Sequence, residues 1–213
     1  MPRETFEREL QRLQDDVLAM ASIVEKAIIT SVDTLKNRDI GASRRLIAED
    51  RRINETRFAI EADALALIAM QQPMAKDLRS LAAVLDVAGE LERMGDYAKG
   101  IARINLLIGE RPLLKPLVDI PLMAEKARDM LHRALDAFAR GDVDLARAIP
   151  AEDDEVDQLY NHVYRELLTC VIADQSAIEQ SNFLLWVAHN LERTADRVTN
   201  ICERVIFTVT GEL

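Results

Sequence analysis

The sequence contains little glycine, little proline and few aromatic residues. Over 213 residues there are 7 glycines and 6 prolines, and aromatic side chains make up 4% of the chain. A turn-rich β-sandwich or barrel needs more of these residues, so the composition argues against both. Apolar residues account for 49%, which is enough for one or two buried cores and argues against intrinsic disorder. We therefore expect an all-α fold.

Cysteine, basic charge and long apolar runs are also scarce. Cys170 and Cys202 lie in apolar stretches without C-x-x-C spacing, so we expect small core residues rather than a disulfide or metal ligands. The 27 basic and 37 acidic residues give a net charge of −10, the wrong sign for binding nucleic acid. No uncharged run approaches the roughly 18 residues of a membrane span, and the charged N-terminus is unlike a signal peptide. We expect a soluble, cytoplasmic protein.

The few turn residues divide the chain into six expected helices. Breaks are predicted at Asn37–Gly41, at Pro73 and at Arg140–Asp142. The segment from Gly109 to Pro121 holds three of the six prolines and is the expected connection between two halves. The helices are expected over residues 4–37, 41–71, 74–108, 120–139, 143–172 and 177–209.

The two halves of the chain are copies of each other. Ala48–Asp50 recurs as Ala151–Asp153, 103 residues later, and Leu91–Arg93 recurs as Leu191–Arg193, 100 residues later. The three-residue difference falls in a turn, which is typical of a real internal duplication. Short connections place neighbouring helices antiparallel. The expected domains are a first three-helix bundle at 1–108, a linker at 109–120 and a second three-helix bundle at 121–213.

Acidic residues recur with the duplication and interrupt the apolar pattern. Glu92 and Asp96 in the first half, and Glu192 and Asp196 in the second, are each spaced i, i+4, so each pair lies on one helix face. Gly95 lies beside the first pair and costs helix stability, by roughly 1 kcal/mol relative to Ala. We therefore expect a close approach of another segment at Gly95.

A second set of acids lies on the preceding helix of each half. Asp153 and Asp157 are again spaced i, i+4, and the first half has Asp50 and Asn54 at the corresponding positions. We expect the Asp153 face to be buried, because it also carries Tyr160, Tyr164, Leu167 and Val171. A carboxylate inside a bundle must be protonated, paired or bound to a cation.

Two interpretations of these acids stay open. Ordinary ion pairs along a helix are common and weak. The candidate pairs are Arg93 with Glu90 or Asp96, Arg193 with Asp196, and Arg57 with Asp50. Recurrence on two helices of each half instead favours a shared site. Carboxylates without His or Cys form a hard oxygen site, which suits Mg, Mn or Fe.

Catalytic motifs are not apparent. The three histidines, His132, His162 and His189, do not recur between the halves, and the Glu-x-x-His motif of di-iron proteins is missing. His132 is expected to be exposed on its helix. The sequence also contains no glycine-rich phosphate loop and no G-x-S-x-G. We therefore expect a protein that is not an enzyme.

Several segments, taken in their order along the chain, resemble the PhoU family of phosphate transport regulators. The resemblance covers essentially the whole chain as two tandem repeats. Its markers are Gln72–Arg79, Glu90–Asp96, Asn190–Asp196, Asn200–Glu203 and the closing Val209–Glu212.

The resemblance implies two three-helix bundles with an acidic motif in each that can hold a multinuclear metal cluster. The implied metal ligands are Glu92, Asp96, Glu192 and Asp196, faced by Asp50, Asn54, Asp153 and Asp157. The ion is not specified, and Fe, Mn, Mg and Zn are all candidates.

The resemblance also implies a function and partners. A PhoU protein connects a Pst-type phosphate ABC transporter, through its ATPase, to a membrane sensor histidine kinase, and it keeps the phosphate-starvation response off when phosphate is plentiful. We expect such an adaptor to be a homodimer that reaches the membrane only through its partners.

The sequence departs from the family pattern in places. Thr194–Ala195 replaces the usual Ile-Gly of the second motif, and Asn54 supplies one charge less than Asp157, so the two sites can differ in affinity. Two alternative functions stay open: an accessory regulator of another phosphate or ion transporter, and a carboxylate-bridged metalloenzyme. A gene for a Pst-type transporter or a histidine kinase beside this gene would favour the PhoU function over the first alternative.

Overall fold

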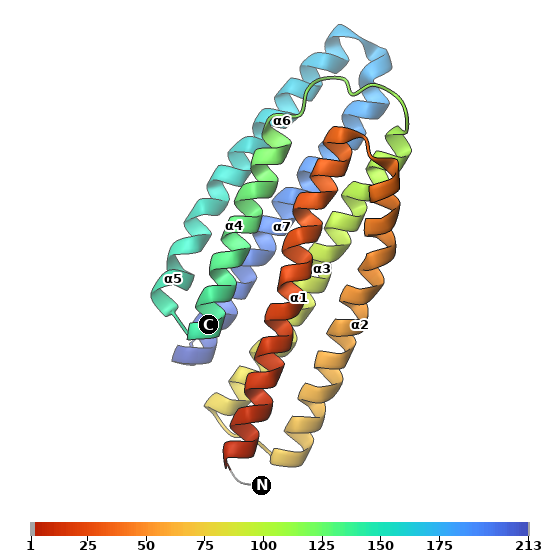
Figure 1. The fold of residues 1–213 in the computed structure, drawn as a ribbon. Helices are drawn as coiled ribbons and strands as arrows, with labels where there is room; N and C mark the ends of the chain where they lie inside the picture. The colour runs from red at the N-terminus through yellow and green to blue at the C-terminus, as the bar shows by residue number, and fades with distance from the viewer. Residues whose placement is uncertain (1–2, 213) are drawn as a thin grey trace.

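A computed structural model describes residues 3–212, which form helices and connecting segments but no strand (Figure 1). The all-α fold is confirmed. The α-helices are α1 (Arg3–Asn37), α2 (Ile40–Gln71), α3 (Lys76–Ile108), α4 (Asp119–Arg140), α5 (Val143–Ala148), α6 (Asp153–Ala173) and α7 (Ile178–Thr210). Two short 3-10 turns, Ile149–Glu152 and Gln175–Ala177, precede α6 and α7.

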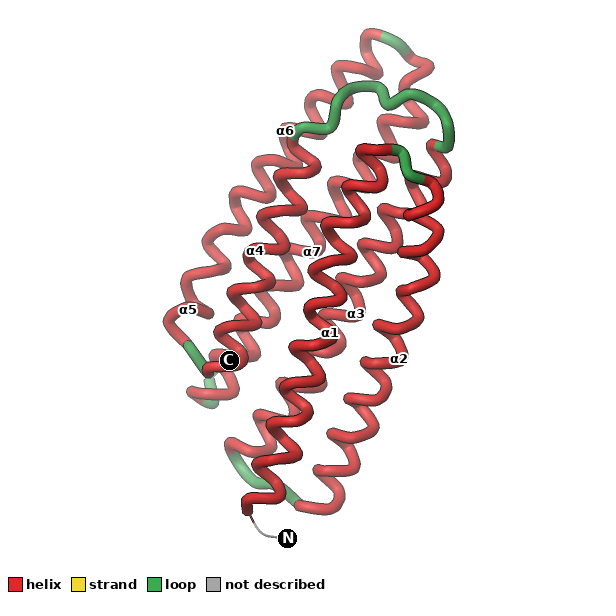
Figure 2. Tube along the Cα trace, in the orientation of Figure 1, coloured by secondary structure: helices red, strands yellow, loops and turns green. Residues whose placement is uncertain are grey.

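The helices form two bundles that lie side by side. The first contains α1, α2 and α3, and the second contains α4, α6 and α7 together with the short α5. Helix α3 packs along α7, and α1 packs along α4, so the bundles share one long interface (Figure 1). Loops are confined to the ends of the helices, and the longest one connects α3 to α4 over residues 109–118 (Figure 2).

Aspartate caps begin the second helix of each half. The Asp39 side chain accepts a hydrogen bond from the backbone N–H of Ala42 at 2.8 Å, and Asp142 accepts one from Leu145 at 3.0 Å. Each cap satisfies an N–H that has no partner within its own helix. The predicted breaks before these helices are confirmed.

The expected single helix over 143–172 is wrong. Helix α5 ends at Ala148, a 3-10 turn follows at Ile149–Glu152, and α6 begins only at Asp153. The reason is Pro150, which has no N–H to donate and whose ring clashes with the carbonyl one turn earlier. The break matters for the acidic cluster described below, because it places Asp153 in the first turn of α6.

The face that α6 buries agrees with the expectation only in part, since Leu167 is buried as expected. Its buried residues are Val156, Val163 and Leu167, whereas Asp157 is exposed and Tyr164 is 48% exposed. Two stripes on this helix compete for the contact with α4 and α7. The apolar stripe is buried and Asp157 is left exposed, because burying Asp157 would cost its hydration.

The two cysteines are free thiols that differ in burial. Cys202 is fully buried in the core, and Cys170 is half-buried; both are free thiols. Burial raises the pKa of Cys202 to about 12, which keeps it an unreactive thiol.

Within residues 3–212, none of the helices combines the length and the apolar character that a membrane span requires.

Polar contacts between the bundles hold α3 against α7. Arg197 of α7 lies 3.4 Å from the Glu90 carboxylate of α3, and both side chains are largely buried. Further along, Gly100 of α3 faces Asn190 of α7, where an added Cβ would lie 3.2 Å from Nδ2. These contacts set the two halves in one register.

A buried amide closes the first bundle. Asn105 of α3 donates from Nδ2 to the Thr34 carbonyl at 3.0 Å and to the Ser43 hydroxyl at 2.8 Å. These groups lie at the end of α1 and the start of α2, so one side chain ties all three helices. The second half has the buried Val205 at the corresponding position.

Candidate metal centres

The first acidic cluster lies between α2 and α3. Asp50 and Asn54 belong to α2, and Glu92 and Asp96 belong to α3. The predicted close approach at Gly95 is confirmed, since a Cβ there would lie 2.8 Å from Cδ1 of Ile53 and 3.8 Å from Oδ1 of Asp50. Glycine therefore allows α2 to come near α3 at the height of the acids.

A lysine that the sequence analysis missed occupies this cluster. Lys99 of α3 donates from Nζ to Asp50 Oδ2 at 2.7 Å and also to Asp96 Oδ1. Asn54 donates from Nδ2 to the same Asp50 oxygen at 3.1 Å. One ammonium is thus shared between carboxylates from two helices.

Burial and charge act together on the first cluster. Asp50 is only 8% exposed, and its Oδ1 is buried without a hydrogen bond. Burial raises the pKa of Glu92, and the Asp96 charge adds to this effect. For Lys99, burial opposes the charged form, but the hydrogen bonds to Asp50 and Asp96 outweigh it and raise the pKa.

The second acidic cluster lies between α6 and α7. Asp153 and Asp157 of α6 lie near Glu192 and Asp196 of α7, close enough for their charges to interact. Burial, followed by the charges of Asp196, Asp157 and Glu192, raises the pKa of Asp153 to about 6. Burial followed by the Asp196 charge also raises the pKa of Glu192 and that of Asp157.

The second cluster has no counterpart of the bridging lysine. Thr199 stands 100 residues after Lys99, and its hydroxyl donates to the backbone carbonyl of Asp196 at 2.7 Å. Asp153 Oδ1 and Glu192 Oε2 are buried without a hydrogen bond. The first cluster therefore combines three carboxylates with an ammonium, whereas the second has four carboxylates and no ammonium from a lysine.

The predicted ion pairs along the helices form only in part. The predicted Arg193 pair forms, with Nε 3.7 Å from Asp196 Oδ2. A pair that was not predicted brings His189 Nδ1 to 3.2 Å from Glu192 Oε2 without a hydrogen bond. Arg57 pairs with Glu61 at 3.3 Å instead of with Asp50. Both partial pairs of the second cluster lie along α7, so neither connects the two helices.

The eight predicted residues gather on facing helices, but their acids do not form a compact group of three ligand atoms. Among residues 3–212, no three acids of either cluster bring ligand atoms within 4.8 Å of one another. Like charges without a metal ion repel, and this repulsion favours side chains that point away from each other. The clusters are sites of concentrated negative charge rather than compact ligand cages.

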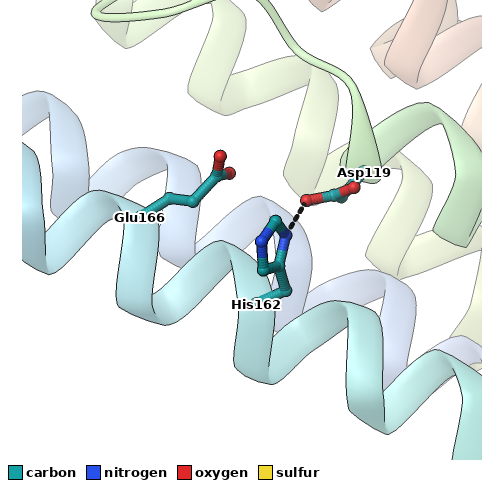
Figure 3. Close-up of side chains that lie close together, drawn as sticks. All are labelled: Asp119, His162 and Glu166. Carbon is teal, nitrogen blue, oxygen red and sulfur yellow. Dashed lines mark hydrogen bonds and ion pairs between the residues drawn. The ribbon is translucent and has the colours of Figure 1, made fainter.

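A different group does bring three ligand atoms within 4.8 Å. Asp119, at the start of α4, meets His162 and Glu166 of α6 (Figure 3). His162 Nδ1 lies 2.5 Å from Asp119 Oδ2, and Lys115 pairs with Glu166. The His-x-x-x-Glu spacing was visible in the sequence, but Asp119 joins it only through the packing of α4 on α6.

His132 agrees with its sequence interpretation. Its side chain is 63% exposed on α4, where Nδ1 lies 3.2 Å from Glu25 Oε1 of α1. It therefore contributes a contact between the bundles rather than a ligand to either acidic cluster.

The whole chain matches known proteins with the same repeated architecture. The family model of the PhoU domain matches twice, at residues 17–104 and 120–205, so one match falls on each bundle. The chain belongs to the PhoU family. The resemblance inferred from the sequence motifs is confirmed.

Curated PhoU relatives span nearly all of this chain. It is 36% identical over 216 residues to the phosphate-specific transport system accessory protein PhoU homolog of Clostridium acetobutylicum, covering 100% of this chain and 97% of that protein. It is 34% identical over 207 residues to the phosphate-specific transport system accessory protein PhoU of Escherichia coli, covering 97% and 86%.

Solved PhoU structures share the fold. The crystal structure of PhoU from Pseudomonas aeruginosa aligns with a TM-score of 0.92 and 33% identity, covering 97% of this chain and 100% of that one. The regulatory protein PhoU from Streptococcus pneumoniae aligns with a TM-score of 0.90 and 31% identity, covering 98% of each chain.

Proposed function

We propose that this PhoU chain is a non-enzymatic accessory protein of a phosphate-specific transport system. The observation that carries this proposal is the end-to-end match to relatives named for that role, which includes both repeats. The match extends over the packed pair of bundles, so it concerns the whole assembly of helices rather than one motif.

We further propose that the chain acts as an adaptor. In this proposal a cytoplasmic homodimer contacts the ATPase of a phosphate ABC transporter and a sensor histidine kinase, and it keeps the phosphate-starvation response off when phosphate is plentiful. Large apolar side chains exposed on both bundles support contacts with proteins; Phe58 of α2 and Trp186 of α7 are 59% and 53% exposed.

A genetic experiment tests the regulatory role. Deleting the gene should switch on a phosphate-starvation reporter in phosphate-rich medium, and restoring the wild-type gene should switch it off. Co-purification with the transporter ATPase and with the kinase tests the two partners separately, and sedimentation tests the dimer. A reporter that stays off in the deletion strain would contradict the proposal. Altered uptake of a different ion in that strain would favour the alternative transporter.

We also propose that the second acidic cluster binds a metal ion. Asp153 and Asp157 of α6 and Glu192 and Asp196 of α7 would supply oxygen ligands, which suit Mg, Mn or iron and fit zinc less well. The buried Oδ1 of Asp153, which accepts no hydrogen bond, supports this assignment. A bound cation would neutralise their repulsion and join α6 to α7, so occupancy would alter the stability of the second bundle.

Metal analysis of the purified protein tests this second proposal. Stoichiometric metal that is lost in a variant with Asp153→Asn and Glu192→Gln would support it. Metal retained by that variant would contradict it. A separate His162→Ala variant controls for ions held by the Asp119, His162 and Glu166 group.

A further inference from the structure

The first acidic cluster already contains a cation. The Lys99 ammonium lies 2.7 Å from Asp50 on α2 and also hydrogen-bonds Asp96 on its own helix. The lysine side chain is 17% exposed and that of Asp50 is 9% exposed, so little water reaches the contact. The ammonium thus joins α2 to α3 as a bridging metal ion would.

This arrangement disfavours a metal ion at the same place. A divalent cation between Asp50 and Asp96 would have to displace the ammonium, because two positive charges at contact distance repel strongly where water is scarce. The displaced ammonium would lose both hydrogen bonds and stay tethered to the next turn of α3. Lys99 is part of the chain and competes with the ion at any metal concentration.

The internal duplication allows the second cluster to be compared with the first. The second cluster has Thr199 at the Lys99 position, and the threonine hydroxyl is turned to its own helix backbone. The neighbouring basic side chains there, Arg193 and His189, pair with the acids Asp196 and Glu192 of their own helix α7. Asp157 also adds a charge where the first half has the neutral Asn54.

We propose that Lys99 is a built-in cation that closes the first acidic cluster to metal ions, so that metal binding at the repeated acids is confined to the second half. Only the statement that metal binds at the second cluster rests on the function proposed above. The statement about the first cluster stands on the contacts of Lys99 with Asp50 and Asp96 and on the burial of this lysine and Asp50.

Substitutions at Lys99 and at Thr199 test the inference. Metal-free full-length protein is titrated with Mn²⁺ by calorimetry, with electron paramagnetic resonance to count bound ions. Lys99→Met should add a site, with affinity increased by about 100-fold or more over the wild-type first cluster. Asp50→Asn in the Lys99→Met background should remove the added site. Thr199→Lys should weaken the second cluster by a similar factor.

Two control variants locate the effect. Lys76→Met removes an exposed lysine at the start of α3, 16 residues before Glu92 on the same helix, and should leave binding unchanged. His162→Ala excludes ions held by the third ligand group. Circular dichroism checks that each variant is folded. If Lys99→Met does not fold, Lys99→Thr copies the residue of the second half and takes its place.

The outcomes separate this inference from the proposed metal function. Wild-type protein that binds Mn²⁺ equally at both clusters, or a Lys99 variant that gains no binding, overturns the inference. Where the wild-type protein binds Mn²⁺ at the second cluster, unchanged binding in Thr199→Lys also overturns the inference. If wild-type protein binds no Mn²⁺ while Lys99→Met does, the closing role of Lys99 is supported and the metal proposal for the second half fails.

Discussion

Replacing glycine at two positions of α3 should have opposite effects on stability. At Gly95 an added methyl would lie 2.8 Å from Cδ1 and 3.3 Å from Cγ2 of Ile53, whereas at Gly89 an added methyl meets nothing within 4 Å. Each Gly→Ala change gains about 1 kcal/mol of helix propensity. At Gly95 the overlap should cost about 2 kcal/mol, because Ile53 must leave its preferred position in a packed core.

The expected net effects are a gain of about 1 kcal/mol for Gly89→Ala and a loss of about 1 kcal/mol for Gly95→Ala. This separation corresponds to melting temperatures that differ by about 4–8 °C for a chain of this length. Urea unfolding followed by circular dichroism measures both values. Ile53→Val removes the nearest carbon, so in the Gly95→Ala background it should cost less than it does alone.

Equal stabilisation by the two changes would refute the reasoning, because it would mean that α2 does not approach α3 closely at Gly95. The second half provides an internal comparison. Ala195 is buried at the corresponding position, so the second bundle accommodates the methyl group that the first bundle excludes.

Three further predictions concern charge and buried polar groups. Asp153 has a pKa of about 6, above its usual 3.8, so its ionised form destabilises the folded state. In metal-free buffer Asp153→Asn should therefore gain about 1 kcal/mol above pH 6, after solvent screening, and nothing near pH 3, below the pKa of the unfolded chain; urea unfolding at each pH measures this. Asn105→Val should lower the free energy of unfolding by about 1–2 kcal/mol in the same assay, since the hydrogen bonds to the α1–α2 turn are lost. Glu90→Gln should cost about 1–3 kcal/mol by leaving Arg197 unpaired between the bundles, and adding Arg197→Met should recover part of that loss; strict additivity in this double-mutant cycle would argue against the ion pair.

Local signals in the sequence determined the helices and the repeated organisation. Caps such as Asp39 and Asp142 act on backbone groups within one turn, so they can be recognised without knowledge of the fold. Pro150 is also a local signal for a helix break. Apolar residues recur at helical spacing on both sides of Pro150, and this periodicity led to the wrong prediction of one continuous helix. The i, i+4 spacing likewise placed the repeated acids on shared helix faces.

Only the tertiary structure decided what the acids face. Lys99 and Asp50 are 49 residues apart, and their contact depends on how α2 is rotated against α3. The same dependence decides which stripe of α6 is buried and brings Asp119 to His162. Periodicity determines the residues that share a face of one helix, whereas the rotation and approach of two helices follow from the packing of all their side chains together. The sequence by itself therefore determined the family, the helices, the duplicated acids and the exchange of Lys99 for Thr199, and packing brought Lys99 between the carboxylates of two helices.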